Sequence, residues 1–405
     1  MPSPKKPTVL FVAEAVTLAH FARIVSLAKS LDPSKYNIVI ASDPRYLELQ
    51  QPLPFSFQAI YSIPSSSFSE ALAKGNPVYD ADTLTQYVED DLQLLDKIKP
   101  DLVVGDFRLS LSISAPLAKV PYAAVVNAYW SPYADISYPI PDLMLTKIVG
   151  VKLGQRLFNA VRPLVFALHA RPLNKTRQRF GLPALKYDMR TAYTAADYTL
   201  YTDIPDAVPM QPTPSSHHHL GPVLWSTNTA LPEWWDNLPT DKPIVFVTLG
   251  SSGQATLLPM ILQALAELPL TIIAATVNKI QLNKLPDNVF IHDYLPLDIA
   301  CQRSHAVISN GGSMTTYQAF RSGVPVIGIA GNMDQLLNMQ AIEHMGAGIT
   351  LRAGGITQAS IKTAVNNLLH TPSYPQATKQ ITEKLRQYDP GQRFREIVTN
   401  ILSLD

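Results

Sequence analysis

The stretch from His305 to Gly348, HAVISNGGSMTTYQAFRSGVPVIGIAGNMDQLLNMQAIEHMGAG, decides the fold of this chain. It begins with an apolar run, 306–309, of the kind that forms a buried parallel strand, and a turn with two glycines, 310–313, follows. An amphipathic segment, 314–321, and a second apolar run, 324–329, come next. The order strand, glycine turn, helix, strand predicts a βαβ unit.

The glycine turn predicts a site for an anion. Gly311 and Gly312 carry no side chains, so a ligand can approach the backbone closely. Because a helix begins at the same place, its free N–H groups and the positive end of its dipole face that spot. Ser313, Thr315 and Thr316 add hydroxyl donors. A diphosphate fits such a turn without a metal ion.

A carboxylate and a carboxamide stand after the second apolar run. We expect Asp334 and Gln335 at the carboxyl end of that strand, where open α/β sheets bind ligands. Together they accept and donate hydrogen bonds, which suits the hydroxyl groups of a sugar. Taken singly, the glycine pair is typical of a tight turn and Asp334 of a helix N-cap. The whole pattern, as far as Gly346-Ala347-Gly348, favours a nucleotide-sugar site.

This pattern resembles the nucleotide-sugar signature near the C-terminus of UDP-glycosyltransferases and their bacterial relatives. The shared positions are Gly311-Gly312, Thr315, Gly323-Val324-Pro325, Asp334-Gln335, Asn338 and Gly346-Ala347-Gly348. Two positions depart from the signature, because the family's diphosphate-binding His is Asn310 here and the Glu that usually holds the ribose is Gln318. Both replacements can form hydrogen bonds, but neither carries charge.

The resemblance also implies a catalytic pair in the first half of the chain. Family members carry a general-base His after the first strand, within a Gly-His-x-x-Pro run that reads Ala19-His20-Phe21-Ala22-Arg23 here. Asp106, at the end of a buried strand, matches the carboxylate that hydrogen-bonds this His. Taken alone, a single His near a helix start is more typical of a cap or a packing residue. Asp106 is equally well read as a helix or turn cap.

Three further donor-side residues follow from the resemblance. The family has a Gly-Ser turn near the diphosphate, which corresponds to Ser251 and Ser252 here. It often has an aromatic residue ahead of a proline that stacks on the uracil or thymine base, and Tyr294 stands at that place. From the residue alone, a core tyrosine is an equally good interpretation of Tyr294.

Composition narrows the class of protein. At 405 residues the chain is expected to form about two domains, and 33 basic against 32 acidic residues give no sign of a nucleic-acid partner. The single cysteine, Cys301, excludes an intramolecular disulfide and a cysteine cluster for zinc. No run has the length of a membrane span, and the short N-terminal apolar run indicates a strand and not a signal peptide. We therefore expect a cytoplasmic protein. The first strand is not followed by G-x-G-x-x-G, which weighs against a nicotinamide or flavin enzyme.

Three segments suggest other chemistry. Asp80-Ala81-Asp82 could hold a divalent ion, but its context favours a loop or a helix start. His217-His218-His219 lies in a loop-rich region, where consecutive residues cannot all face one ion. Residues 143–187 contain nine Lys or Arg and no Asp or Glu. They could meet an anionic lipid surface or an acidic acceptor, but helices with a packed apolar face and a wet basic face are favoured.

The predicted fold class is α/β, with two Rossmann-like domains facing each other across a cleft, the GT-B arrangement. An acceptor-binding domain covers residues 1–220, and a linker covers 221–242. A nucleotide-sugar-binding domain covers 243–388, and a C-terminal helix, 389–405, packs back on the first domain. The resemblance places the acceptor pocket around Tyr129–Tyr138 and in 143–187.

The predicted function is inverting glycosyl transfer from a UDP- or dTDP-sugar to a hydroxyl group of a small apolar acceptor, with no metal, no cofactor and no nucleic acid. His20 would take the proton and Asp106 would orient it. The helix end after Gly312, with Thr315 and Ser251, would meet the charge of the leaving diphosphate. A nucleotide-sugar 2-epimerase of the same fold and a non-catalytic nucleotide-sugar-binding relative remain open. The sequence names neither the sugar nor the acceptor.

Overall fold

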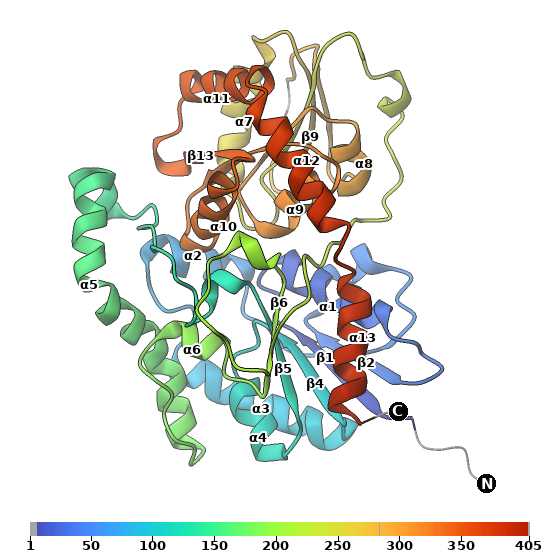
Figure 1. Ribbon diagram of the computed structural model, residues 1–405, viewed down its shortest axis with the longest axis vertical. Helices are drawn as coiled ribbons and strands as arrows, with labels where there is room; N and C mark the ends of the chain where they lie inside the picture. Colours follow the sequence, from blue (N-terminus) through green and yellow to red (C-terminus); the bar gives the residue numbers. More distant parts are fainter. Residues whose placement is uncertain (1–5, 283, 404–405) are drawn as a thin grey trace. The chain divides into compact units, whose positions relative to one another are not determined.

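A computed structural model describes residues 6–282 and 284–403 of the chain. These residues form two α/β units, each built on a parallel sheet (Figure 1). The first unit contains Met1–Ser137, Arg156–Val223 and Asp389–Asp405, and the second contains Tyr138–Gln155 and Leu224–Tyr388. The prediction of two parallel-sheet α/β domains is confirmed. Residues 1–5, at the start of the predicted first domain, and 404–405, at the end of the predicted C-terminal helix, lie outside the described range.

The first unit has a seven-stranded sheet in the order β3-β2-β1-β4-β5-β6-β7, and all neighbours are parallel. Its strands are β1 (Thr8–Ala13), β2 (Asn37–Ser42), β3 (Ser56–Ala59), β4 (Leu102–Asp106), β5 (Tyr122–Val126), β6 (Tyr198–Tyr201) and β7 (His217–His219). The strand order reverses between β1 and β4. In open α/β sheets, ligands bind outside the carboxyl ends of the strands at such a switch point.

The helices of this unit contribute buried side chains to its apolar cores. They are α1 (Leu18–Ser30), α2 (Ser65–Lys74), α3 (Ala81–Ile98), α4 (Leu111–Ala118), α6 (Met189–Tyr193) and α13 (Pro390–Ile401). Phe21 and Ile24 of α1 share one core with Phe394 and Val398 of α13, so the C-terminal helix completes the first unit. Apolar residues at helical spacing on both helices explain this packing.

The structure corrects the interpretation of the three histidines and decides that of Asp80. The three histidines, expected in a loop, form β7, and His217 Nδ1 lies 2.7 Å from the Tyr201 hydroxyl of β6. A three-residue run carries too little periodicity to be recognised as a strand. The helix-start interpretation of Asp80 is confirmed, because its carboxylate caps α3 by accepting a hydrogen bond of 2.7 Å from the Thr83 N–H.

Helix α5 (Met144–Arg179) begins in the second unit and ends in the first, and Gly150, with φ of 75° and ψ of 161°, interrupts it. We expected its apolar side chains to pack and its basic ones to be wet. Phe158 and Phe166 are buried, but Leu157 and Leu164 are exposed. The expectation is therefore wrong for nine large apolar residues of α5, which are exposed. Apolar positions occur on two sides of this helix, and periodicity does not say which side is covered.

The second unit has a six-stranded parallel sheet in the order β10-β9-β8-β11-β12-β13. Its strands are β8 (Ile244–Thr248), β9 (Thr271–Ala275), β10 (Val289–His292), β11 (Ala306–Ser309), β12 (Val326–Ala330) and β13 (Gly348–Arg352). Its helices are α7 (Leu258–Ala266), α8 (Leu297–Gln302), α9 (Ser313–Arg321), α10 (Met333–His344), α11 (Gln358–His370) and α12 (Ser373–Leu385). The order reverses between β8 and β11, so the turns after these two strands lie together.

Candidate active site

His20 and Asp106 meet at the switch point of the first sheet. His20 is the third residue of α1, after β1, and Asp106 is the last residue of β4. Their Nδ1 and Oδ1 atoms are 2.8 Å apart, and the two side chains are 17% and 1% exposed. The His20 ring stacks on Phe107, with centroids 4.9 Å apart and planes within 7°. The ring is thus held in one orientation, which leaves Nε2 as the nitrogen that can exchange a proton.

Arg23 is a third member of this cluster that the sequence analysis missed. Its Nε donates to Asp106 Oδ2 at 2.7 Å and its Nη2 to Asp106 Oδ1 at 2.8 Å, a two-point contact. Its Nη1 donates to Asn127 Oδ1 at 2.8 Å. Arg23 stands three residues after His20, so both lie on one side of the helix. That spacing, at the place where the family run has a proline, was the available signal.

The electrostatics of Asp106 follow from these neighbours. Burial by itself raises the pKa of Asp106, but Arg23 and then His20 outweigh it and hold this pKa below its ordinary value. Asp106 is therefore a carboxylate at neutral pH and can only accept hydrogen bonds. It can hold the His20 N–H at Nδ1, which is the role of an orienting group beside a general base.

In the second unit, the glycine turn is built as the sequence indicates. Gly311 has a φ of 78°, and a Cβ there would lie 2.7 Å from Met339 Cγ, so the turn requires glycine. Gly312 is the N-cap of α9. Asn338, on α10, donates to the Gly311 carbonyl at 2.8 Å and to Thr316 Oγ1 at 3.0 Å. These contacts fix the turn before any ligand binds.

Asn310 joins the two neighbouring turns of this sheet. It is buried, its Nδ2 donates to Ser252 Oγ at 2.9 Å, and its Oδ1 accepts from the Gly312 N–H at 3.3 Å. Ser252 belongs to the turn after β8 and Asn310 to the turn after β11. The side chain expected to face a phosphate thus also has a structural role. Its contact with a phosphate stays a prediction.

A cation stands beside the same turns. Lys279 follows β9, and its Nζ donates to the Ser251 carbonyl. Desolvation lowers the pKa of Lys279. The sequence analysis missed this residue, because a lone lysine in a loop has no pattern. The strand order would have revealed it: β9 is the neighbour of β8, so the loops after both strands share one edge.

In the Gln335 side chain, the oxygen is hydrogen-bonded and, within the described part of the chain, the nitrogen is not. Its Oε1 accepts from the Gly331 N–H at 3.0 Å, within a capping box formed with Asn332. Its Nε2 is buried and has no hydrogen-bond partner among the residues that the structure describes. Asp334 is half-buried in the first turn of α10, and because Asn332 is the N-cap, the cap interpretation of Asp334 is wrong.

The remaining donor-side candidates belong to α9, which follows the glycine turn, or to the loop after β10. Thr316 is buried, and its hydroxyl donates to the carbonyls of Gly312 at 3.1 Å and Ser313 at 3.0 Å, so its expected role as a free donor is wrong. Thr315 is half-buried. Gln318 is buried within α9, and Tyr294, after β10, is half-buried.

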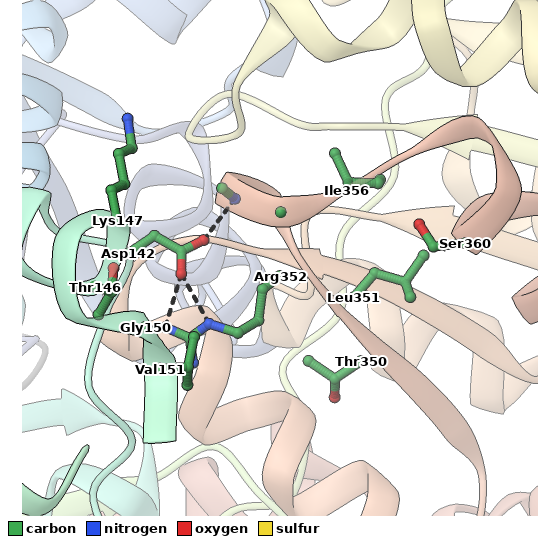
Figure 2. Close-up of a pocket in the computed structure, with 12 residues that line it drawn as sticks. Asp142, Thr146, Lys147, Gly150, Val151, Thr350, Leu351, Arg352, Ile356 and Ser360 are labelled. Carbon is green, nitrogen blue, oxygen red and sulfur yellow. Dashed lines mark hydrogen bonds and ion pairs between the residues drawn. The ribbon is translucent and has the colours of Figure 1, made fainter. Parts of the chain in front are cut away.

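The segment before α5 is attached to the second unit beside Gly331. Asp142 accepts from Arg352 Nε at 2.8 Å and from the Gly354 N–H at 2.7 Å, and its own N–H donates to the Gly331 carbonyl at 2.8 Å. Figure 2 shows the bonds of Asp142 to Arg352 and Gly354 at the rim of a pocket of about 320 Å³ between α5 and β13. A segment from the first half of the sequence thus supports the loop that leads into α10, whose first turn carries Asp334 and Gln335.

No group of three or more His, Cys, Asp or Glu residues could hold a metal ion in the part of the chain that the structure describes. Among residues 6–282 and 284–403, no helix is long and apolar enough to cross a membrane.

The sequence is similar to known proteins over almost its whole length. Residues 259–403 match the family model described as Erythromycin biosynthesis protein CIII-like, C-terminal domain. A PGL/p-HBAD biosynthesis rhamnosyltransferase of Mycobacterium bovis (strain BCG / Pasteur 1173P2) is 49% identical over 400 residues, which cover 99% of this chain and 88% of that protein.

Solved structures share the fold at low sequence identity. The spinosyn forosaminyltransferase SpnP is 19% identical with a TM-score of 0.72, and the match covers 98% of this chain and 100% of that one. The spinosyn rhamnosyltransferase SpnG complexed with thymidine diphosphate is 17% identical with a TM-score of 0.68, and the match covers 96% and 99%.

Proposed function

This chain belongs to the glycosyltransferase family of the mycobacterial PGL/p-HBAD biosynthesis enzymes, and from that premise we propose a specific reaction for it. The enzyme moves a sugar from a dTDP- or UDP-sugar to a hydroxyl group of a small apolar acceptor and inverts the anomeric carbon. The observation that carries this proposal is the 2.8 Å contact between His20 Nδ1 and Asp106 Oδ1, because it prepares Nε2 to act as a base.

The proposed chemistry is one displacement. His20 Nε2 takes the proton of the acceptor hydroxyl as the acceptor oxygen forms its bond to the anomeric carbon. The bond from that carbon to the diphosphate oxygen breaks with its electron pair, and the nucleoside diphosphate leaves. Asp106 stabilises the imidazolium that forms. Arg23 keeps Asp106 ionised throughout, because it lowers the pKa of that carboxyl.

The proposed donor site uses many neutral donors and one cation. The N–H groups at the start of α9 and the Thr315 hydroxyl face the charge that develops on the leaving diphosphate. Lys279 supplies the positive charge that the family's His would bring and that Asn310 lacks. The unengaged Nε2 of Gln335 donates to a sugar hydroxyl, with Asp334 as the neighbouring acceptor.

The remaining donor roles are assigned by resemblance. Tyr294 stacks on the pyrimidine base, Gln318 takes the ribose side, and Ser251 and Ser252 lie by the diphosphate. We propose rhamnose as the first sugar to test, because the 49% identical relative is named a rhamnosyltransferase. The donor is the only nucleotide compound in this scheme, and no cofactor or metal takes part.

The test is a transfer assay with dTDP-rhamnose, UDP-rhamnose and UDP-glucose as donors and alkyl-substituted phenols as acceptors. We expect acceptor-dependent release of the nucleoside diphosphate and a product whose anomeric configuration, read from its NMR coupling constants, is opposite to that of the donor. Change of the sugar without an acceptor would point to the epimerase. Nucleotide binding without turnover of any donor would point to the non-catalytic relative.

We also propose, as a separate part of the function, that residues 143–187 make a peripheral contact with a membrane. The support is their composition, nine basic residues without an acidic one, together with the exposed leucines of α5. An acceptor that dissolves in lipid would then be met where it is concentrated.

A further inference from the structure

Helix α5 exposes an apolar row within the first unit. Leu157, Val161, Leu164 and Leu168 are 45%, 47%, 63% and 47% exposed. Their spacing of four, three and four residues places them on one side of the helix. Phe158, Phe166 and Leu173, on the other side, are buried. The helix is therefore already anchored by one apolar side, and the exposed row adds nothing to the core.

Exposed apolar side chains concentrate on this helix. Thirteen large apolar residues are exposed in the described part of the chain, and nine of them belong to α5. Single exposed leucines are normal on protein surfaces, but a continuous row marks a contact with another apolar phase or partner. We therefore expect the exposed row to contact another apolar surface.

The charge of residues 143–187 indicates what kind of surface contacts the row. Residues 143–187 carry no Asp or Glu, and Arg156, Arg171 and Lys175 of α5 are exposed near the row. A second copy of the chain that joined through this same side would bring these cations together, and like charges repel. A negatively charged surface attracts them, and it lowers the energy of every basic residue in the segment.

We infer that the exposed side of α5 rests in the interface of an anionic lipid membrane. The four apolar side chains enter the boundary of the acyl chains, and the basic side chains reach the phosphate groups. The helix lies on the membrane and does not cross it, in agreement with its polarity, because no helix of the described residues is both long and apolar enough to span a membrane. This inference rests on the proposed membrane contact and not on the transfer reaction, so lipid binding and transfer are measured separately.

The first experiment is co-sedimentation with vesicles. Wild-type protein should bind vesicles of phosphatidylglycerol and phosphatidylcholine, bind those of phosphatidylcholine alone at least about tenfold more weakly, and dissociate in high salt. The quadruple variant Leu157→Gln/Val161→Gln/Leu164→Gln/Leu168→Gln should lose binding about tenfold or more. Leu117→Gln is the matched control, because Leu117 is an exposed leucine on α4, and it should bind as wild type does.

A charge series completes the test. Arg156→Glu/Arg171→Glu/Lys175→Glu should lose binding to the anionic vesicles, while the control Lys29→Glu/Lys35→Glu/Lys119→Glu, on exposed sites elsewhere, should lose much less. Circular dichroism melting verifies that each variant is folded.

Three outcomes would overturn the inference. The first is unchanged vesicle binding by a folded quadruple variant. The second is equal binding to charged and uncharged vesicles. The third is a dimer of the wild type, seen by sedimentation equilibrium, that the quadruple variant lacks, which would assign the row to a second copy. Failure of the transfer assay would leave all three measurements intact.

Discussion

The two units prepare their candidate site residues in opposite ways. In the first, Asp106 and Arg23 are buried charged groups that hold the His20 ring by short polar contacts. In the second, the turn at Gly311 is held by neutral side chains and by its own backbone. A base needs one nitrogen in one orientation, and fixed charges supply that. A diphosphate is met by many weak donors, so no single side chain decides its binding.

The largest effect on stability should follow from replacing Arg23, because the buried cluster of Arg23, Asp106 and His20 depends on its charge. Arg23→Gln leaves the buried Asp106 carboxylate without its two-point partner, which should lower the free energy of unfolding by about 3–5 kcal/mol at pH 7. Denaturant unfolding measures this. Asn338→Ala, in the neutral turn, should cost about 1–3 kcal/mol. Equal losses would remove the contrast between the units.

The same variant has a pH signature. The pKa of Asp106 is lowered in the folded wild type, so its stabilising contribution is full above the unfolded value of about 3.9 and is lost as the pH falls through the lower folded pKa. The difference in stability between wild type and Arg23→Gln should therefore shrink as the pH is lowered toward 3. A difference that stays constant would contradict the assigned electrostatics.

Removing the base separates the two units functionally. His20→Ala should lower the transfer rate by about a hundredfold or more, since that is the usual contribution of general-base catalysis. Calorimetric binding of dTDP should hardly change, because the donor turn belongs to the other unit. Asp106→Asn should give a smaller loss of rate, and His218→Ala is the control. A normal rate in His20→Ala would sink its assignment as the base.

In the second unit, a single change should have a modest effect. Asn310→Ala removes one neutral hydrogen-bonding group and the link to Ser252, so the Kd for dTDP and UDP should rise about fivefold, equivalent to about 1 kcal/mol. Asn310→His should bind at least as tightly as wild type, because charge-assisted bonds are stronger. Calorimetry decides the order. If Asn310→Ala binds both nucleotides as tightly as wild type, Asn310 has only a structural role in the turn.

Lys279 is the one cation assigned to the proposed donor site, and the effect of removing it should be small and sensitive to salt. Lys279→Met should raise the Kd for dTDP about two- to fivefold at low ionic strength and less at high ionic strength, because Lys279 is exposed and its charge is screened. Lys242→Met is the matched control, since Lys242 lies just before β8, at the amino ends of the strands and away from the turns that follow them. Equal effects of both changes would show only a general charge effect.

The smallest expected effect is that of a chelator. We expect the transfer rate to be unchanged in excess EDTA, because helix-end N–H groups and Lys279 take the place of a metal at the diphosphate. A loss of rate that magnesium or manganese restores would contradict this and would reopen Asp80 and Asp82 as ligands.

The sequence predicted the second unit's turn better than the first unit's cluster, for a physical reason. Asn310, Gly311 and Gly312 are adjacent, so local pattern defines them. His20 and Asp106 are 86 residues apart, and their pairing was predicted from the resemblance to the glycosyltransferase family, not from a local pattern. Arg23 and Lys279 were missed because their partners depend on helix packing and strand order, which hydrophobic periodicity does not contain.

The same limit explains α5. Its apolar residues were visible in the sequence, but which of them the domain covers depends on tertiary packing. The end of β11 was predicted at residue 309, where the structure has it, because an apolar run leads directly into a glycine turn there. The exposure of Leu157 and Leu164 could not be predicted, because the sequence alone does not distinguish a leucine that another element covers from one that remains exposed.

The path of the chain through its units has a consequence for recombinant hybrids. The chain passes between the units four times, after Ser137, Gln155, Val223 and Tyr388. A hybrid of two relatives joined once, near residue 223, would exchange neither unit whole. It would pair Asp142 of one parent with Arg352 of the other, and it would insert a foreign α13 into the first core. A hybrid designed to exchange one whole unit has to move 138–155 with the second unit and 389–405 with the first.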